Sequence, residues 1–276
     1  MAGRLFLVAT PIGNLGDFSA RAIEVLRQVS LIACEDTRHS RVLLDHHGIG
    51  TPTTSLPAFA ETERAQGLVA RLTAGADVAI ISDAGSPAIS DPGEHLVALS
   101  VAAGATVVPV PGPSAVIAAL SASGLPTGRF HFLGFLPRQQ SDARAMVAEV
   151  AGLSATLVFY ESPRRVAETL VTLHELLGDR RACVARELTK LHETFERGTL
   201  SALAARFGAH EPLGEIVIIV EGRVGEARWS DEEMTRALTL GLSAGERLKS
   251  LSTDLAHRGG WSSQDVYRLG LQLKSR

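Results

Sequence analysis

Short, continuous apolar runs alternate along the first half of the chain with longer stretches of helical spacing. The apolar runs predict strands at residues 5–9, 31–34, 78–81 and 107–110. Between them apolar residues recur every three to four positions, which predicts helices at 20–29, 62–73, 94–103 and 114–123. Buried strands that alternate with helices are typical of an α/β fold with a largely parallel sheet.

A second α/β unit is predicted after residues 123–128, where Gly and Pro are dense and favour a linker. The strands expected there are 130–135, 156–160, 182–185 and 215–220, and the helices are 141–151, 163–177 and 200–207. Three domains are therefore expected: an N-terminal α/β domain at 1–122, a second α/β domain at 123–225 and a small helical region at 226–276.

The helical region carries its own start and stop signals. Ser230 to Glu233 has the pattern of a capping box, residues 244–257 are amphipathic, and Ser262 to Asp265 opens a final helix. This appendage suits either packing and dimerisation or contact with RNA.

Composition narrows the class of protein. Apolar residues at 45% and charged residues at 21% describe a globular chain, and a net charge of −3 disfavours bulk coating of nucleic acid while leaving room for local arginine patches. Cys34 and Cys183 lie in apolar runs and are expected to be reduced core residues. No metal is predicted, and without a signal-peptide pattern or long apolar run a cytoplasmic location is expected.

Three loops rich in small residues and proline follow predicted strands, at residues 10–17, 82–93 and 111–115. The carboxyl ends of strands in an open α/β sheet line the crevice in which ligands bind. The loops are therefore predicted to form one ligand site, although an ordinary strand-to-helix connection remains the alternative for each.

Motifs in these loops resemble those of the 16S rRNA cytidine 2′-O-methyltransferase family (ribosomal RNA small subunit methyltransferase I), within the tetrapyrrole methylase superfamily. The matching stretches run in order along the chain: residues 8–17, 32–38, 82–93, 111–115, 123–126, 134–137, 159–163 and 186–190. The resemblance implies two α/β domains with a cleft between them, S-adenosyl-L-methionine as methyl donor, the small ribosomal subunit as partner and a homodimer. It assigns cofactor binding to Pro11, Gly13, Ala84, Gly85, Ser86, Ile89, Ser114, Ala115, Tyr160 and Glu161.

Charged residues beside the loops are the candidates for the acceptor side. Asp36 or Glu187 is hypothesised as the base, with Lys190 in the same catalytic group. Substrate contact is predicted for Glu35, Arg38, Arg164, Arg165 and Arg186, because arginine binds phosphate through paired hydrogen bonds. Helix capping is the alternative for Glu35 and Asp36. Arg164 stands where the family would have His.

Two other functions remain open. One is a methyltransferase of the same fold that acts on a small, tetrapyrrole-like molecule or on a protein; its acceptor site would be a deep, apolar trough. The other is a non-catalytic protein that binds RNA or assists ribosome assembly. Such a protein would bind S-adenosylmethionine without methylating RNA.

Overall fold

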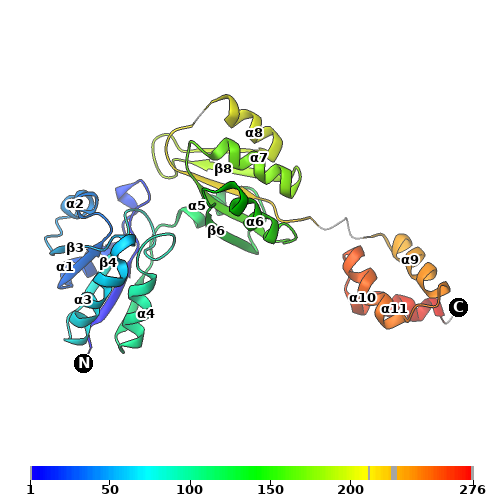
Figure 1. Ribbon diagram of the computed structural model, residues 1–276, viewed down its shortest axis with the longest axis horizontal. Helices are drawn as coiled ribbons and strands as arrows, with labels where there is room; N and C mark the ends of the chain where they lie inside the picture. The colour runs from blue at the N-terminus through cyan, green and yellow to red at the C-terminus, as the bar shows by residue number, and fades with distance from the viewer. Residues whose placement is uncertain (1, 211, 225–228, 275–276) are drawn as a thin grey trace.

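A computed structural model describes residues 2–210, 212–224 and 229–274. Figure 1 shows three parts in chain order: an α/β unit that carries the N-terminus, a second α/β unit, and a group of helices at the C-terminal end. This arrangement confirms the predicted fold class, two α/β units followed by a helical appendage.

The first sheet is parallel, with strand order β3-β2-β4-β1-β5. Its strands are β1 (Arg4–Val8), β2 (Leu31–Cys34), β3 (Thr53–Ser55), β4 (Val78–Ile81) and β5 (Thr106–Val110). The apolar runs predicted all of them except β3. That strand was missed because its Thr-Thr-Ser sequence lacks the apolar pattern of a strand; it forms the edge of the sheet, where no neighbour covers its outer side.

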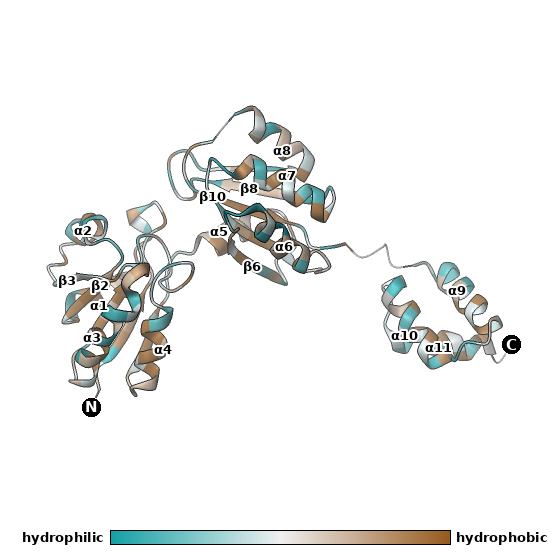
Figure 2. Cartoon of the chain, viewed as in Figure 1, coloured by the Kyte–Doolittle hydropathy of each residue, from teal (hydrophilic) through white to brown (hydrophobic). Residues whose placement is uncertain are grey.

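Helices cover both faces of this sheet. They are α1 (Ala20–Gln28), α2 (Thr37–His46), α3 (Glu61–Thr73) and α4 (Glu94–Ala102), with 3-10 turns at Leu15–Asp17 and Ala58–Ala60. Successive side chains of a strand point to opposite faces. Accordingly, Phe6 and Val8 pack with residues of α1 and α2, whereas Leu5 packs with residues of α3 and α4. Figure 2 shows these strands as mainly hydrophobic.

The second sheet is mixed, with strand order β6-β7-β10-β8-β9 and only β6 and β7 parallel. Its strands are β6 (Phe130–Phe135), β7 (Thr156–Glu161), β8 (Arg181–Arg186), β9 (Thr194–Thr199) and β10 (Ile216–Val220). The apolar pattern missed β9, because Glu and Arg occupy this half-exposed edge strand.

The helices of the second unit are α5 (Ala115–Ala122), α6 (Gln140–Val150), α7 (Val166–Leu177) and α8 (Leu200–Ala209). The expected helix at 163–177 begins only at Val166, because residues 163–165 form a turn. Residues of α6, α7 and α8 share one core with the sheet, and α5 packs in a separate core with Val158, Cys183 and Ile219. The chain thus crosses to the second sheet before α5, and the division at 122/123 stays a proposal.

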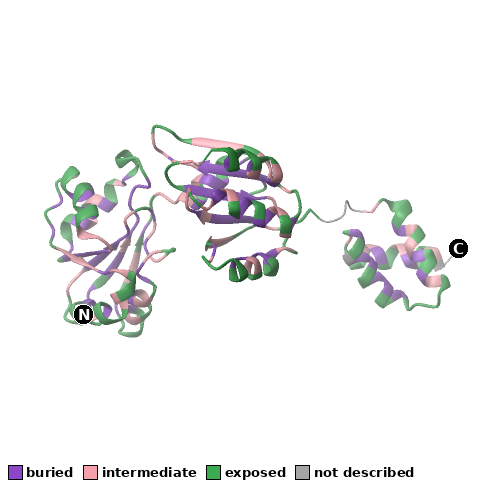
Figure 3. Ribbon diagram, turned by 45° about the horizontal axis from the view of Figure 1, so that its top comes forward, coloured by how far each residue is buried: buried purple, intermediate pink, exposed green. Residues whose placement is uncertain are grey.

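The C-terminal helices, α9 (Asp231–Ser243), α10 (Leu248–Gly259) and α11 (Ser263–Lys274), share a small core of their own. Figure 3 shows buried residues at the centre of this group. The capping box is present: Glu233 N donates to Ser230 Oγ at 3.2 Å, and Ser230 N donates to Glu233 Oε2 at 2.7 Å. The helix expected from 244 begins at Leu248, after Gly245 with φ +84° ends the preceding turn. The predicted boundary at 225/226 lies outside the described residues.

Candidate active site

The loop that follows β4 is fastened to the end of β1. Gly85 and Thr10 exchange backbone hydrogen bonds of 2.8 and 3.2 Å as an isolated antiparallel bridge. Thr10 Oγ1 donates to the carbonyl of Ser82 at 3.0 Å, and Ser82 Oγ donates to the carbonyl of Gly85 at 2.8 Å. The hydroxyls of Thr10 and Ser82 and the backbone bridge therefore hold the loop after β4 in place, which fixes the position of the residues that follow.

The far half of the same loop holds a strained conformation. Ala88 and Ser90 have φ of +66° and +59°, in the left-handed region that side chains disfavour. Glu61 Oε1 accepts from the backbone N–H groups of Gly93 and Leu96 at 3.0 and 3.1 Å, so α3 anchors the start of α4. Such backbone strain persists only where the surroundings enforce it, and it concentrates at functional sites.

These loops and the ends of four strands of the second unit enclose a cavity of about 430 Å³. The first unit supplies Ile12, Asp83, Ala84, Gly85, Ser86, Ile89, Ser90 and Asp91. Ser114 and Ala115, where the chain enters α5, also line the cavity. The second unit supplies Phe135, Tyr160, Glu161, Ser162, Pro163, Leu188, Gly214, Glu215, Ile216 and Val217. A volume of this size suits a nucleoside-sized ligand. The three predicted loops do converge on one site.

Most of the residues predicted to bind the cofactor line this cavity; Pro11 and Gly13 do not. Pro11 is buried and Gly13 is exposed. A Cβ atom built on Gly13 would lie 2.6 Å from Lys190 Cγ, so the first loop contacts the second unit at this point. The cofactor roles themselves stay predictions.

Glu161 lines the cavity, but its carboxylate is occupied by protein partners. Thr169 Oγ1 donates to Oε2 at 2.6 Å and Ser162 N donates to Oε1 at 2.7 Å, while Arg165 lies 3.7 Å away. Arg165 also donates to the carbonyls of Leu136 and Pro137 at 3.0 and 2.8 Å. These contacts hold the turn that follows β7. They also mean that the Arg165 guanidinium already binds groups of the protein itself.

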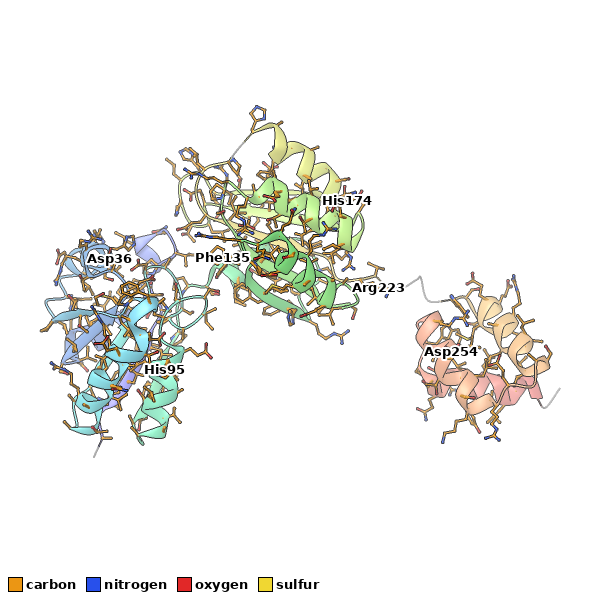
Figure 4. All side chains as sticks on the ribbon, viewed as in Figure 1. Asp36, His95, Phe135, His174, Arg223 and Asp254 are labelled. Atoms are coloured by element: carbon orange, nitrogen blue, oxygen red, sulfur yellow. The ribbon has the colours of Figure 1, made fainter. Side chains whose placement is uncertain are left out.

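Asp36 caps α2. Its carboxylate accepts from Arg38 N at 2.8 Å and pairs with the Arg38 guanidinium at 2.9 Å. The hydrogen bonds from the Arg38 side chain and backbone lower the Asp36 pKa to about 2. Asp36 is not among the residues that line the cavity, which favours the capping alternative. Figure 4 labels Asp36 on the first unit and Phe135 on the second.

Glu187 and Lys190 form an ion pair beside the cavity. Lys190 Nζ donates to Glu187 Oε1 at 2.9 Å and to Glu215 Oε2 at 3.1 Å. The hydrogen bond from Lys190 lowers the Glu187 pKa, and although burial opposes it, the bonds to Glu187 and Glu215 raise the Lys190 pKa. Of these three residues only Glu215 lines the cavity.

The residues predicted to hold the substrate are not among those that line the cavity. Arg38 and Arg164 are exposed, and Arg186 donates to Thr194 Oγ1 and the carbonyl of Leu213, both at 3.3 Å. Glu35 is partly buried; burial and the nearby Asp83 and Asp36 raise its pKa. Their roles stay predictions.

The site prediction omitted Glu215, which lines the cavity just before β10. It also omitted two carboxylates of the loop after β4 that line the cavity, Asp83 and Asp91. Burial, followed by the charges of Glu35 and Asp83, raises the Asp91 pKa to about 6. Both residues belong to the loop that sequence singled out, but their spacing alone cannot show which way a loop carboxylate faces. Sequence also gave no sign that Phe135 and Tyr160 contact each other; their ring centroids lie 5.3 Å apart.

The residues that the structure describes contain no group of three or more His, Cys, Asp or Glu side chains placed to hold a metal ion. Within the same ranges no helix has the length and apolar character needed to cross a membrane.

The parallel sheet, the mixed sheet and the cavity between them define a known class of protein. The chain belongs to the tetrapyrrole (corrin/porphyrin) methylase family, whose sequence profile matches residues 4–204. This result confirms the fold and the methyltransferase class predicted from sequence.

Individual relatives indicate the kind of methyltransferase more closely than the family does. The chain is 45% identical to the ribosomal RNA small subunit methyltransferase I of Mesorhizobium japonicum, over 98% of this chain and 92% of the relative. It is 51% identical to the protein of the same name from Xylella fastidiosa, over 80% of this chain and 82% of the relative. Among solved structures it resembles a uroporphyrin-III C-methyltransferase from Thermus thermophilus complexed with S-adenyl homocysteine. That likeness has a TM-score of 0.59 and 19% identity, over 79% of this chain and 97% of the other, and concerns the fold alone.

Proposed function

We propose that this protein transfers the methyl group of S-adenosyl-L-methionine to the 2′-hydroxyl of a cytidine in the decoding region of 16S ribosomal RNA. The observation that carries the proposal is the cavity where the loops after β1, β4 and β5 meet the second unit. The names of relatives that match almost the whole chain support ribosomal RNA of the small subunit as the acceptor.

The cavity fits S-adenosylmethionine in its size and in its chemistry. Ile12, Leu188 and Val217 offer an apolar surface to an adenine ring, and Ser86 and Ser114 offer hydroxyls to the ribose or the amino acid end. Gly85, with φ +84°, lets the backbone approach closely. The bound cofactor supplies an electrophilic methyl group on a sulfonium.

The chain's own contribution is mainly positioning. The loops after β1 and β4 form one wall of the cavity. The bridge between Thr10 and Gly85 and the anchor at Glu61 hold this first wall in place before any ligand binds. Keeping two reactants aligned can supply about 7–11 kcal/mol of the barrier reduction. Arg38 and Arg164 are exposed, and their guanidinium groups are proposed to bind RNA phosphates.

Ribose mapping with a cavity-blocking variant tests the proposal. Purified protein, S-adenosylmethionine and small ribosomal subunits are incubated, and methylated riboses are mapped by mass spectrometry. Ala115→Phe fills the cavity and is expected to abolish methylation, while Ser121→Phe places the same ring at an exposed position of α5 and is expected to leave it intact. Methylation of a small molecule or protein instead of RNA would replace this function by the small-molecule or protein alternative.

We also propose that the active form is a cytoplasmic homodimer, as the family resemblance implies. Sedimentation of the purified protein tests the oligomeric state, and a monomer at micromolar concentration would contradict the homodimer.

We propose in addition that the chain divides into three parts at 1–122, 123–225 and 226–276. Limited proteolysis tests this division and should cut first near these boundaries.

A further inference from the structure

Four carboxylates line the cavity within the described residues: Asp83, Asp91, Glu161 and Glu215. Two of them are occupied. Glu161 accepts from Thr169 and Ser162, and Glu215 is paired with Lys190 at 3.1 Å. The two remaining carboxylates both come from the strained loop after β4.

Asp91 is the carboxylate with the most freedom to meet a ligand. No hydrogen bond or ion pair of its side chain occurs among the residues that the structure describes, and the side chain is only half-buried. Asp83 differs, because its Oδ1 is buried without a hydrogen-bond partner. Asp91 can therefore reach a hydroxyl inside the cavity, whereas Asp83 supplies a negative charge that acts on Asp91.

The loop carries Asp91 to the boundary between the two units. A Cβ atom built on Gly134 would lie 3.4 Å from Ser90 Oγ, so the residue before Asp91 reaches the bulge of β6. On the other side of the cavity the Asp91 charge contributes to a raised Tyr160 pKa, after burial as the larger cause. Asp91 thus faces the part of the cavity that residues of both units line.

The geometry points to Asp91 as the group that accepts the proton of the acceptor hydroxyl, an inference that rests on the proposed methyl transfer. The ribose O2′ forms the new O–C bond to the methyl carbon as the S–C bond breaks, and the bonding electron pair stays on sulfur. The O2′ proton passes to an Asp91 carboxylate oxygen, and from there to water after product leaves.

The surroundings of Asp91 suit this task. The ionisable groups that face it are Glu35 at the end of β2, Asp83 after β4 and Tyr160 on β7. Burial and the two carboxylates raise its pKa to about 6. A base works best when its pKa lies near the working pH, whereas Asp36, with a pKa of about 2, would be a weak proton acceptor.

The first experiment combines rate and affinity measurements on Asp91→Asn. The single-turnover methylation rate is expected to fall on the order of 10²- to 10⁴-fold. Affinities for S-adenosylmethionine and for S-adenosylhomocysteine, which lacks the sulfonium charge, are both expected to stay within about threefold of the original protein, because Asn keeps the size of the side chain. Asp142→Asn, at an exposed position of α6, is the matched control.

Two outcomes overturn the inference. If Asp91→Asn keeps its full rate, Asp91 does not accept the proton. If instead it loses affinity for S-adenosylmethionine but keeps affinity for S-adenosylhomocysteine, Asp91 stabilises the sulfonium charge. Absence of RNA methylation by the unchanged protein overturns the proposed function, and the inference with it.

A second variant tests the role of the neighbouring charge. The methylation rate of the original protein is expected to rise with pH around 6 as Asp91 loses its proton. Asp83→Asn removes a negative charge and should move this midpoint to lower pH. The same shift should appear in the carboxyl carbon signal of Asp91 by NMR, without any turnover. Asp91→Glu should recover part of the methylation rate that Asp91→Asn loses. A pH midpoint that does not move in Asp83→Asn contradicts the inference.

Discussion

Lys190 of the second unit lies directly over Gly13 of the first loop, where a Cβ atom would come within 2.6 Å of Lys190 Cγ. Gly13 has φ +154°, so a side chain at this position meets both steric crowding and an unfavourable backbone. The Lys190 ammonium at the same time bridges Glu187 and Glu215. This contact joins the loop after β1 to the second wall of the cavity.

Gly13→Ala should therefore disturb the cavity as well as the fold. We expect a loss of about 1–3 kcal/mol in the free energy of unfolding, together with weaker cofactor binding. Denaturant unfolding and calorimetry with sinefungin measure the two effects. Gly50→Ala is the control, because no atom lies within 4 Å of a Cβ there; equal effects of both substitutions would argue against the Lys190 contact.

Glu161 offers a test of structural against ligand-binding roles. Its side chain is 0% exposed and holds hydrogen bonds from Thr169 and Ser162. Glu161→Ala should lower the free energy of unfolding by about 3 kcal/mol, since it leaves buried polar groups unpaired. Glu168→Ala, at an exposed site on α7, should change it by less than about 0.5 kcal/mol. Normal stability with lost cofactor affinity would identify Glu161 as a cofactor ligand instead.

The Asp91 carboxyl should also leave a signature in stability. Its pKa is raised in the folded protein to about 6, so it contributes stability below about pH 4, and that contribution is lost as the pH rises through 6. Asp91→Asn should match the original protein at pH 4 and exceed it at pH 7 by about 1 kcal/mol, allowing for solvent screening. Thermal unfolding of both proteins without ligand from pH 4 to 7 checks this, and a constant difference would refute the shifted pKa.

The C-terminal helices should be separable from the cavity. Their core consists of residues such as Met234, Leu251 and Val266, all within the helical group. A chain that ends at Val224 should bind sinefungin within about threefold of the full chain and keep the unfolding transition of the two α/β units. Methylation of ribosomal subunits by the same chain then decides whether the helices contact RNA, because full activity would leave them a role in packing or dimerisation.

Sequence predicted the strands well where burial left a continuous apolar run, as at β2 and β4. It failed at β3 and β9, because these edge strands expose polar or charged side chains and so lack that run. The cavity followed from three loops at the ends of neighbouring parallel strands, a rule of topology rather than of local pattern. The hydrogen-bond partners of individual side chains could not be predicted, because Asp36 and Asp91 both lie in segments that follow strands. Only the positions of Arg38, Glu35 and Asp83 separate a capping carboxylate from one with a raised pKa.

The fastening of Gly85 to Thr10 assigns unequal tasks to the two walls of the cavity. A loop whose backbone is already tied to the neighbouring strand end by hydrogen bonds has little freedom to adapt its shape to different acceptors. We expect discrimination between acceptors to fall to the opposite side of the cavity, where Phe135 comes from a differently built sheet. A fixed half combined with a variable half allows one fold to serve acceptors of unrelated chemistry.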